Sequence, residues 1–311
     1  MIFIFGDVFM QALLIKMAVF AVMMVLGFWF TKKGILGDAF IKGGSFLVAN
    51  VFLSGTVINS VLNFPEGMTN AEMLKILGVS ILYTAASYLF AEIIGIFLKG
   101  DKQQNAVIKL SIACTNIAMV GIPVAKELYG TAGAFCVSVA CIPFNIFLCS
   151  WGVWWLIRSK GEGKFRFSLP VPLFASVAAL IICLLHLKLP AVLTEVFSTA
   201  AGATVPVSML IIGCQLARAP LKEALSSAKV WMTCFLRLIA TPVVILLLMK
   251  LIGADAALTG SMVICAACPT AVVVTMFSVQ YGGDPLLASE TTMLTTVLSL
   301  ATIPLITLIL L

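Results

Sequence analysis

Charged residues and histidine are scarce in this sequence. Asp, Glu, Lys and Arg make up 10% of its 311 residues, whereas soluble proteins have about 25%, and His186 is the single histidine. The sequence contains neither an HExxH zinc motif nor a GxxxxGK[ST] phosphate-binding loop. We therefore expect no aqueous catalytic domain, no enzyme activity, no metal, no cofactor and no direct use of ATP.

Apolar residues are abundant instead, at 62% of the chain. A helix needs about 20 apolar residues to cross the lipid core, and ten runs of about this length follow one another. They cover residues 8–31, 43–62, 74–98, 104–126, 132–157, 171–188, 193–217, 229–251, 256–280 and 287–311. Because lipid offers no partners to unpaired backbone groups, each run is predicted to be helical. The predicted fold class is an all-α integral membrane protein with ten transmembrane helices in the lipid bilayer.

The nine cysteines all fall within these apolar runs, at positions 114, 136, 141, 149, 183, 214, 234, 265 and 268. This placement is typical of small buried hydrophobic residues and not of a disulfide framework. Cys265 and Cys268 form a CxxC pair, but the second ligand pair that a structural zinc site needs is missing.

Basic residues are distributed unequally between the two sides of the membrane, so the net charge of +6 does not indicate a nucleic-acid partner. The odd-to-even connections contain twelve of them: Lys32, Lys33, Lys42, Lys99, Lys102, Arg158, Lys160, Lys164, Arg166, Arg218, Lys222 and Lys229. The even-to-odd connections contain four: Lys75, Lys126, Lys188 and Lys250. The positive-inside rule places the first set in the cytoplasm and both termini outside.

The basic segment RSKGEGKFRF lies at the midpoint of the chain. It divides the sequence into a first half (1–157), a short basic cytoplasmic loop (158–170) and a second half (171–311). Tyr129 and Tyr281 each precede a glycine and lie 281 − 129 = 152 residues apart. Because each half has five crossings, an odd number, the second half enters the membrane with opposite polarity. The prediction is a 5+5 inverted repeat, as in many secondary transporters.

Runs 4 and 9 contain polar and helix-breaking residues that lipid-facing helices avoid. Near mid-membrane these are Thr115, Asn116, Gly121 and Pro123 in run 4, and Cys268, Pro269 and Thr270 in run 9. Proline removes a backbone donor, so each run is predicted to unwind into two half-helices, whose free N–H groups carry partial positive charge. Two such ends meeting at mid-membrane form a site for an anion. Ordinary proline kinks are the alternative interpretation.

Several segments resemble the auxin efflux carrier family, which includes plant auxin exporters and bacterial carboxylate carriers. The resemblance is carried by TNIAMVGIPVAKELYG in run 4, ACPTAVVVTMFSVQYGGDPLLAS in run 9 and SLATIPLITLIL in run 10, with further similarity in GFWFTKKGIL and PVSMLIIGCQL. It covers nearly the whole chain. The short central loop is more similar to bacterial members than to plant exporters.

The resemblance implies a scaffold made of runs 1, 2, 6 and 7 and a moving transport domain made of runs 3–5 and 8–10. It implies that a carboxylate binds where the broken runs 4 and 9 cross and that it travels by an elevator-like movement. The substrate-binding residues that follow are Thr115, Asn116, Gly121, Pro123, Cys268, Pro269, Thr270 and Ala271. Family members often have proline at the positions of Thr115 and Ser54, so the unwinding of run 4 is assigned to Gly121 and Pro123.

Four charged residues within the runs are further candidates. Glu92 and Arg237 lie at similar depth in runs 3 and 8, which predicts an ion pair; this pair acts as a structural brace or takes part in substrate or proton handling. Lys16 either screens a carboxylate at the domain interface or extends its amine to the membrane surface. Lys109 either attracts anions from the cytoplasm or extends outward in the same way.

The remaining polar candidates have simpler interpretations. Asn50, Asn59 and Gln215 are expected to form hydrogen bonds between helices and not to bind ligand. His186 lies near the outer end of run 6, where an interfacial position is expected, although its titration range also suits a proton sensor.

The leading hypothesis is a secondary transporter of small organic anions, specifically carboxylates, in the cytoplasmic (inner) membrane, with elevator-like alternating access. The alternatives are a sodium-coupled symporter of the bile-acid type, a membrane-embedded enzyme, and a membrane sensor or channel. The sequence leaves open the substrate, the direction of transport, coupling to H+ or Na+, and the presence of a homodimer.

Overall fold

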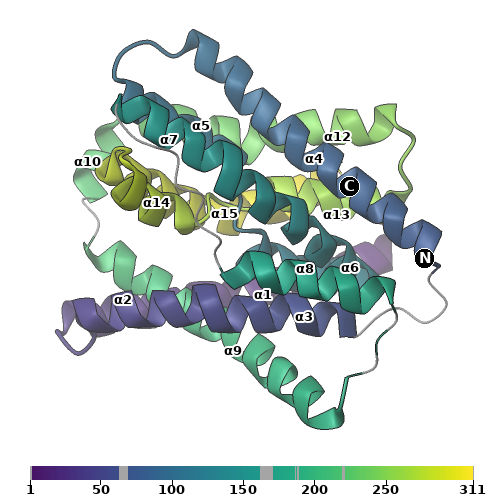
Figure 1. Ribbon diagram of the computed structural model, residues 1–311. Coiled ribbons are helices and arrows are strands. Elements are labelled where there is room, and N and C mark those ends of the chain that lie inside the picture. The colour runs from purple at the N-terminus through teal and green to yellow at the C-terminus, as the bar shows by residue number, and fades with distance from the viewer. Residues whose placement is uncertain are drawn as a thin grey trace.

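The computed structural model describes residues 2–62, 69–161, 171–185, 187, 189–218 and 221–310. Its elements are α1 Ile2–Lys32, α2 Asp38–Leu47, η1 Val48–Phe52, α3 Leu53–Leu62, α4 Asn70–Phe97, α5 Lys102–Ala113, η2 Ile117–Gly121, α6 Ile122–Phe147, η3 Leu148–Gly152, α7 Val153–Lys160, α8 Val171–Leu184, α9 Ala191–Arg218, α10 Leu221–Ser226, α11 Ala228–Phe235, η4 Leu236–Ala240, α12 Thr241–Leu251, α13 Ala256–Ala267, α14 Val273–Tyr281 and α15 Pro285–Leu310 (Figure 1). The η elements are single π-helical turns that continue into neighbouring α-helices.

Seven helical stretches of the described residues are long and apolar enough to cross a membrane. They are Leu14–Lys32, Asp38–Asn59, Asn70–Phe97, Ile117–Lys160, Ala191–Arg218, Ala228–Leu251 and Pro285–Ile309. The helical content and the apolar stretches confirm the predicted all-α integral membrane fold.

The predicted number of ten crossings is not confirmed, because runs 4, 6 and 9 give helices shorter than a full crossing. One of the seven stretches, Ile117–Lys160, is however 44 residues long. At 1.5 Å per residue a straight helix of this length would measure about 66 Å, about twice the thickness of the lipid core. The chain turns inside it, because Tyr129 and Gly130 have non-helical backbone angles and Gly130 has a φ of +63°. Ten crossings therefore stay a prediction.

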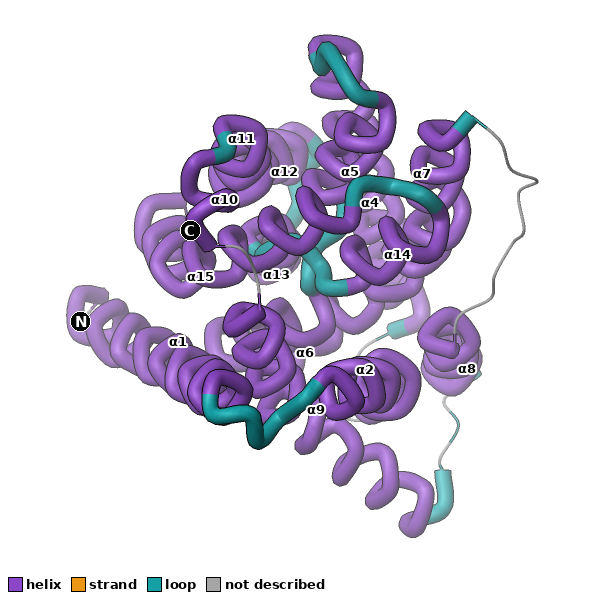
Figure 2. The backbone as a smooth tube through the Cα atoms, turned by 90° about the vertical axis from the view of Figure 1, so that its left-hand side faces the viewer, coloured by secondary structure: helices purple, strands orange, loops and turns teal. Residues whose placement is uncertain are grey.

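The helices pack in two groups. In the first, α9 lies against α1 and α3, and α3 also lies against α8. In the second, α4 packs on α5 and α6, α13 packs on α6 and α12, and α15 packs on α11 and α14. Figure 1 shows the first group in the lower half of the molecule and the second above it, and Figure 2 shows the same division from the side. The first group contains the runs assigned to the scaffold.

Two glycines bring α1 and α9 into close contact. A Cβ atom at Gly27 would collide with the carbonyl oxygen of Leu210, and a Cβ atom at Gly213 would collide with the carbonyl oxygen of Met24. Small residues at such positions allow backbones to approach closely, which is the usual basis of helix association in membranes. The contact fixes α9 against α1 along the first group.

Two short helices of the second group are built alike. Both α5 and α13 have 12 residues, and each begins after an aspartate N-cap, Asp101 or Asp255. Each ends at a cysteine in extended conformation, Cys114 or Cys268. The offsets are equal, at 255 − 101 = 154 and 268 − 114 = 154 residues. The hydrogen bond that Asp255 accepts from the N–H group of Leu258 lowers the pKa of its carboxyl. The equal offsets of the caps and of the cysteines are the spacing that an internal repeat would produce, and the repeat itself stays a prediction.

Candidate functional site

The two breaks in runs 4 and 9 lie directly against each other. After α5 ends, Thr115 forms an antiparallel β-bridge with Thr270, which follows the end of α13. The N–H group of Asn116 donates to the carbonyl of Pro269 (2.8 Å), and the N–H group of Ala271 donates to the carbonyl of Cys114 (3.0 Å). The bridge satisfies backbone groups that would otherwise be unpaired at the two breaks, where lipid could offer them no partner. Two broken helices that cross, as predicted, are therefore present.

The position of the first break differs from the prediction. Gly121 and Pro123 do not unwind the chain, because Gly121 has α-helical angles (φ −64°, ψ −48°) and the helix continues from Ile117 through Pro123 into α6. The break lies earlier, at Cys114 to Asn116, where the backbone pairs with the second break. Proline is tolerated inside a membrane helix where a local π-helical turn re-satisfies the backbone groups that it leaves unpaired, and Pro123 directly follows the π-helical turn Ile117–Gly121. A Cβ atom at Gly121 would lie 3.3 Å from the Sγ of Cys268, so this glycine lets the two crossing segments approach.

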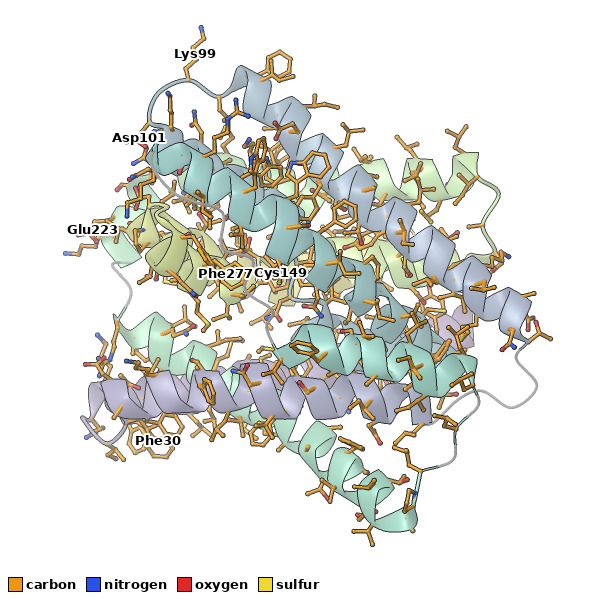
Figure 3. The ribbon with its side chains drawn as sticks, viewed as in Figure 1. Phe30, Lys99, Asp101, Cys149, Glu223 and Phe277 are labelled. Carbon is orange, nitrogen blue, oxygen red and sulfur yellow. The ribbon has the colours of Figure 1, made fainter. Side chains whose placement is uncertain are left out.

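A cavity of about 410 Å³ opens beside this crossing. It lies between the two groups of helices, since its walls come from α2, η1, α3 and α9 on one side and from both breaks, α6 and α14 on the other. The lining residues include Ser45, Phe46, Asn50, Leu53, Val57, Thr115, Asn116, Met119, Phe144, Asn145, Ser208, Ile211, Ala271, Val272, Met276, Phe277, Gln280 and Tyr281. Figure 3 labels Phe277 between the upper and the lower group of helices, whereas Lys99, Asp101 and Glu223 lie at the periphery of the view.

Asn116 is the most distinctive polar residue of the cavity wall. Its side chain is buried, with 6% of the residue exposed, and its Nδ2 donor has no hydrogen-bond partner among the described residues. A buried amide nitrogen without a partner is costly, so Asn116 is the residue of this wall that most needs an explanation. The Oγ of Ser45, on the opposite wall, also has no partner there. By contrast, the amide nitrogens of Asn50 and Asn145 donate to the Phe46 carbonyl and the Ser176 hydroxyl.

Two helices begin at the cavity wall. The helical stretch after the first break starts at Ile117 and contributes Ala118 and Met119, and α14 starts at Val273. The first N–H groups of a helix have no intrahelical acceptors and carry partial positive charge. None of the described residues that line the cavity is charged. The wall therefore combines two helix starts and one buried amide with a surface that is otherwise mostly apolar.

Comparison with protein families decides what kind of protein contains this site. A family model described as a membrane transport protein matches residues 12–167 and 164–307. The chain belongs to this family. It is the auxin efflux carrier family that the sequence resembles, so the predicted family is confirmed. A comparison with curated proteins found no match.

The crossing residues of this membrane transporter have unequal access to the cavity. Thr115, Asn116 and Ala271 line it. The other predicted residues of run 9 are occupied in the structure: the Cys268 carbonyl accepts a hydrogen bond from Arg237, and the Thr270 hydroxyl donates to the Ser111 carbonyl (3.1 Å). These hydrogen bonds hold the second break in place next to the cavity.

The predicted ion pair between Glu92 and Arg237 is wrong. Glu92 accepts a hydrogen bond from the Nζ of Lys109 at 2.9 Å, and Arg237 donates to backbone carbonyls at the crossing. The prediction paired the two residues by their distance from the ends of their runs, but this distance does not determine which way a side chain points around the helix axis. Lys109 also lies over the ring of Trp155, 4.7 Å from its centroid.

The other candidate side chains of the transporter lie outside the crossing. Lys16 is half exposed and forms an ion pair with Glu127 (3.7 Å), which links α1 to α6. Gln215 lines a second, smaller cavity of about 100 Å³ with Thr275 and Thr292. Asn59 has an interaction partner in the structure. His186 lies outside the described residues.

Four residues at or near the site were not expected from the sequence. Ser45, Asn145 and Gln280 line the cavity, and Glu127 joins the two helix groups through Lys16. Asn145 could have been identified from the sequence, because an amide in the middle of an apolar run is unusual in lipid-facing helices. Ser45 and Gln280 lie near the ends of their helices, where polar residues are common, so no pattern distinguishes them.

Proposed function

We propose that this membrane transporter carries small organic anions and that their carboxylate binds at the crossing of the two broken helices. The observation that carries the proposal is the unpartnered Nδ2 donor of Asn116, buried in the cavity wall between the starts of two helices. Hydrogen bonds from neutral donors to a charged acceptor are stronger than bonds between neutral groups. A carboxylate oxygen at this position would satisfy the amide and interact favourably with both helix dipoles.

The rest of the cavity favours an apolar body on the substrate. Phe46, Phe144, Met276 and Phe277 are among its lining residues, and the described lining contains no cationic side chain. A second carboxylate would enter this wall without a countercharge, and burying an unpaired charge is expensive. We therefore expect a monocarboxylate with an aliphatic or aromatic body to bind more tightly than a dicarboxylate of similar size.

The cavity also supports alternating access between the two helix groups. It extends from the crossing towards Ser45 and Phe46 at the start of run 2 and towards Gln280 and Tyr281 at the end of run 9. Both places lie next to connections that the positive-inside rule assigns to the cytoplasm. We infer a state open to the cytoplasm, with the second helix group moving against the first to carry the anion outward or inward. With this orientation we expect both termini to be extracytoplasmic and the loop that contains Lys222 to be cytoplasmic. Lys222→Cys should therefore accept a membrane-impermeant thiol reagent only in permeabilised cells.

A paired ligand comparison tests the substrate class. Purified protein is heated with an aromatic monocarboxylate such as phenylacetate, with the neutral amide phenylacetamide, and with malonate, each at the same concentrations. Ligand that binds only the folded state raises the unfolding temperature. We expect phenylacetate to give the largest rise and phenylacetamide almost none, because only the acid places a negative charge at the crossing. Equal stabilisation by the acid and its amide would contradict an anion site.

A further inference from the structure

Arg237 is the largest side chain that is fully buried in the described part of the transporter, with 0% exposed. It lies in the π-helical turn η4, between α11 and α12. A buried guanidinium without compensation would be very costly, and none of the described carboxylates lies within ion-pair distance of it. Its charge must therefore be balanced by other groups.

Backbone carbonyls provide this balance. The Nε of Arg237 donates to Cys268 (3.1 Å), and its Nη1 donates to Ile112 (2.8 Å). Its Nη2 donates to Ala266 at 2.7 Å and, more weakly, to Cys265 at 3.4 Å. The planar fork of a guanidinium is suited to several acceptors at once.

All of these carbonyls belong to the last turn or the cap of a helix that ends at the crossing. Ile112 is in the last turn of α5, which ends at Ala113; Cys265 and Ala266 are in the last turn of α13, and Cys268 is its C-cap. The last carbonyls of a helix have no intrahelical donors and carry partial negative charge. Two negative helix ends therefore converge on one guanidinium, on the side of the crossing opposite to the two helix starts at the cavity.

We propose that Arg237 is the built-in cation of the crossing, a positioning residue that fills the carbonyl cage between the ends of α5 and α13. In transporters with broken helices, carbonyls at half-helix C-terminal ends often coordinate a coupling cation. Here the guanidinium occupies that cage permanently. It fixes the Ile112 and Cys268 carbonyls, which lie next to the segments that hold Asn116 and Ala271. The inference rests on the proposed function only for the role of Asn116 and Ala271; the cage itself does not depend on the substrate.

Chemical rescue without any substrate tests this cage. Arg237→Ala should lower the unfolding temperature of the purified full-length protein by about 5 °C or more. Guanidinium chloride at about 20 mM, far below denaturing concentrations, should restore at least half of the loss by entering the vacated cage. Choline chloride at the same concentration should restore none. Arg158→Ala is the matched control, because Arg158 is exposed and lies over Trp154, so guanidinium should not stabilise that variant.

A second pair of variants covers the case in which Arg237→Ala gives no folded protein. Arg237→Lys keeps the charge with fewer donors, and Arg237→Met keeps the length without charge. We expect the lysine variant to unfold at a higher temperature than the methionine variant. The proposal is overturned if guanidinium fails to stabilise a folded Arg237→Ala protein, or if Arg237→Met is as stable as Arg237→Lys. No carboxylate ligand is added in these measurements, so neither result depends on whether the transporter carries anions.

Discussion

The two breaks of this transporter share a backbone arrangement but differ in chemistry. Each follows an aspartate-capped helix of 12 residues, and each exchanges one backbone hydrogen bond with the other across the bridge. At the second break, the hydroxyl of Thr270 donates to Ser111 and its N–H group donates to Thr295. At the first break, the side-chain Nδ2 of Asn116 has no partner among the described residues.

This difference predicts that the two breaks have different tasks. The donors of the second break are used to hold the crossing together, so few remain for a ligand. At the first break the Nδ2 atom of Asn116 is buried without a partner among the described residues, and such a group reduces stability. Such a cost is typical of a binding residue whose partner is the substrate. We therefore expect substitutions at the first break to affect binding and those at the second break to affect stability.

The largest effect should come from Asn116→Asp. This change places a negative charge where we propose that the carboxylate binds, in a cavity whose described lining has no cation. Affinity for a monocarboxylate should fall by about a hundredfold or more, since like charges in a poorly solvated site repel strongly. Uptake into proteoliposomes and equilibrium binding measure the loss. Undiminished uptake at matched protein content would move the anion site away from the first break.

Thr270→Val should have the second-largest effect, on stability. Valine has a similar shape but cannot donate to the Ser111 carbonyl, which stays buried without this bond. The expected loss in unfolding free energy is about 1–3 kcal/mol, measured by thermal unfolding without ligand. Monocarboxylate affinity of the folded protein should change less than twofold. A large loss of affinity at unchanged stability would mean that the second break binds the substrate directly.

A smaller effect is expected from the ion pair between Lys16 and Glu127, which joins the two helix groups. Both side chains are partly exposed, so Lys16→Ala should cost less than about 1 kcal/mol of stability. If the groups move against each other, the pair breaks during each cycle, and the variant should change the transport rate more than the affinity. Lys75→Ala is the control, because Lys75 pairs with Asp255 within the second group. Identical rates for both variants and the parent would remove Lys16 from the moving interface.

The smallest effect concerns Glu92. Its ion pair with Lys109 is partly exposed, so a double-mutant cycle of Glu92→Gln and Lys109→Gln should give a coupling of at most about 1 kcal/mol. The corresponding cycle of Glu92→Gln and Arg237→Lys should be additive, because these side chains share no partner. If the coupling energy between Glu92 and Arg237 exceeded that between Glu92 and Lys109, the ion pair predicted from the sequence would be correct after all.

Local features of the sequence predicted the fold class and the two breaks. Long apolar runs can cross lipid only as helices, and the residues Asn116 and Pro269 are conspicuous inside such runs. The exact place of the first break was missed, because it is decided by backbone pairing with the other half of the chain and not by Gly121 or Pro123. Local propensity identifies the residues that tend to break a helix, but hydrogen bonds between distant segments decide at which residue the helix ends.

Side-chain partners at the site were harder to predict than the backbone. Arg237 and Glu92 were paired by depth, whereas the structure directs Arg237 towards the ends of two helices and Glu92 towards Lys109. The cavity wall combines residues from both helix groups, so Ser45 enters the site only through packing between elements that are distant in sequence. A single sequence carries no signal for such packing.

The binding energy of Asn116 tests the central claim most directly, with Asn50 as the matched residue. Both asparagines line the cavity. The side-chain Nδ2 of Asn50 already donates to the Phe46 carbonyl, whereas the side-chain Nδ2 of Asn116 has no partner among the described residues. Titration calorimetry of phenylacetate should show that Asn116→Ala weakens binding by about 1–3 kcal/mol, at an unfolding temperature no lower than that of the parent. Asn50→Ala should leave the affinity almost unchanged. Equal losses in the two variants, or a loss confined to Asn50→Ala, would contradict the assignment of the anion to the first break.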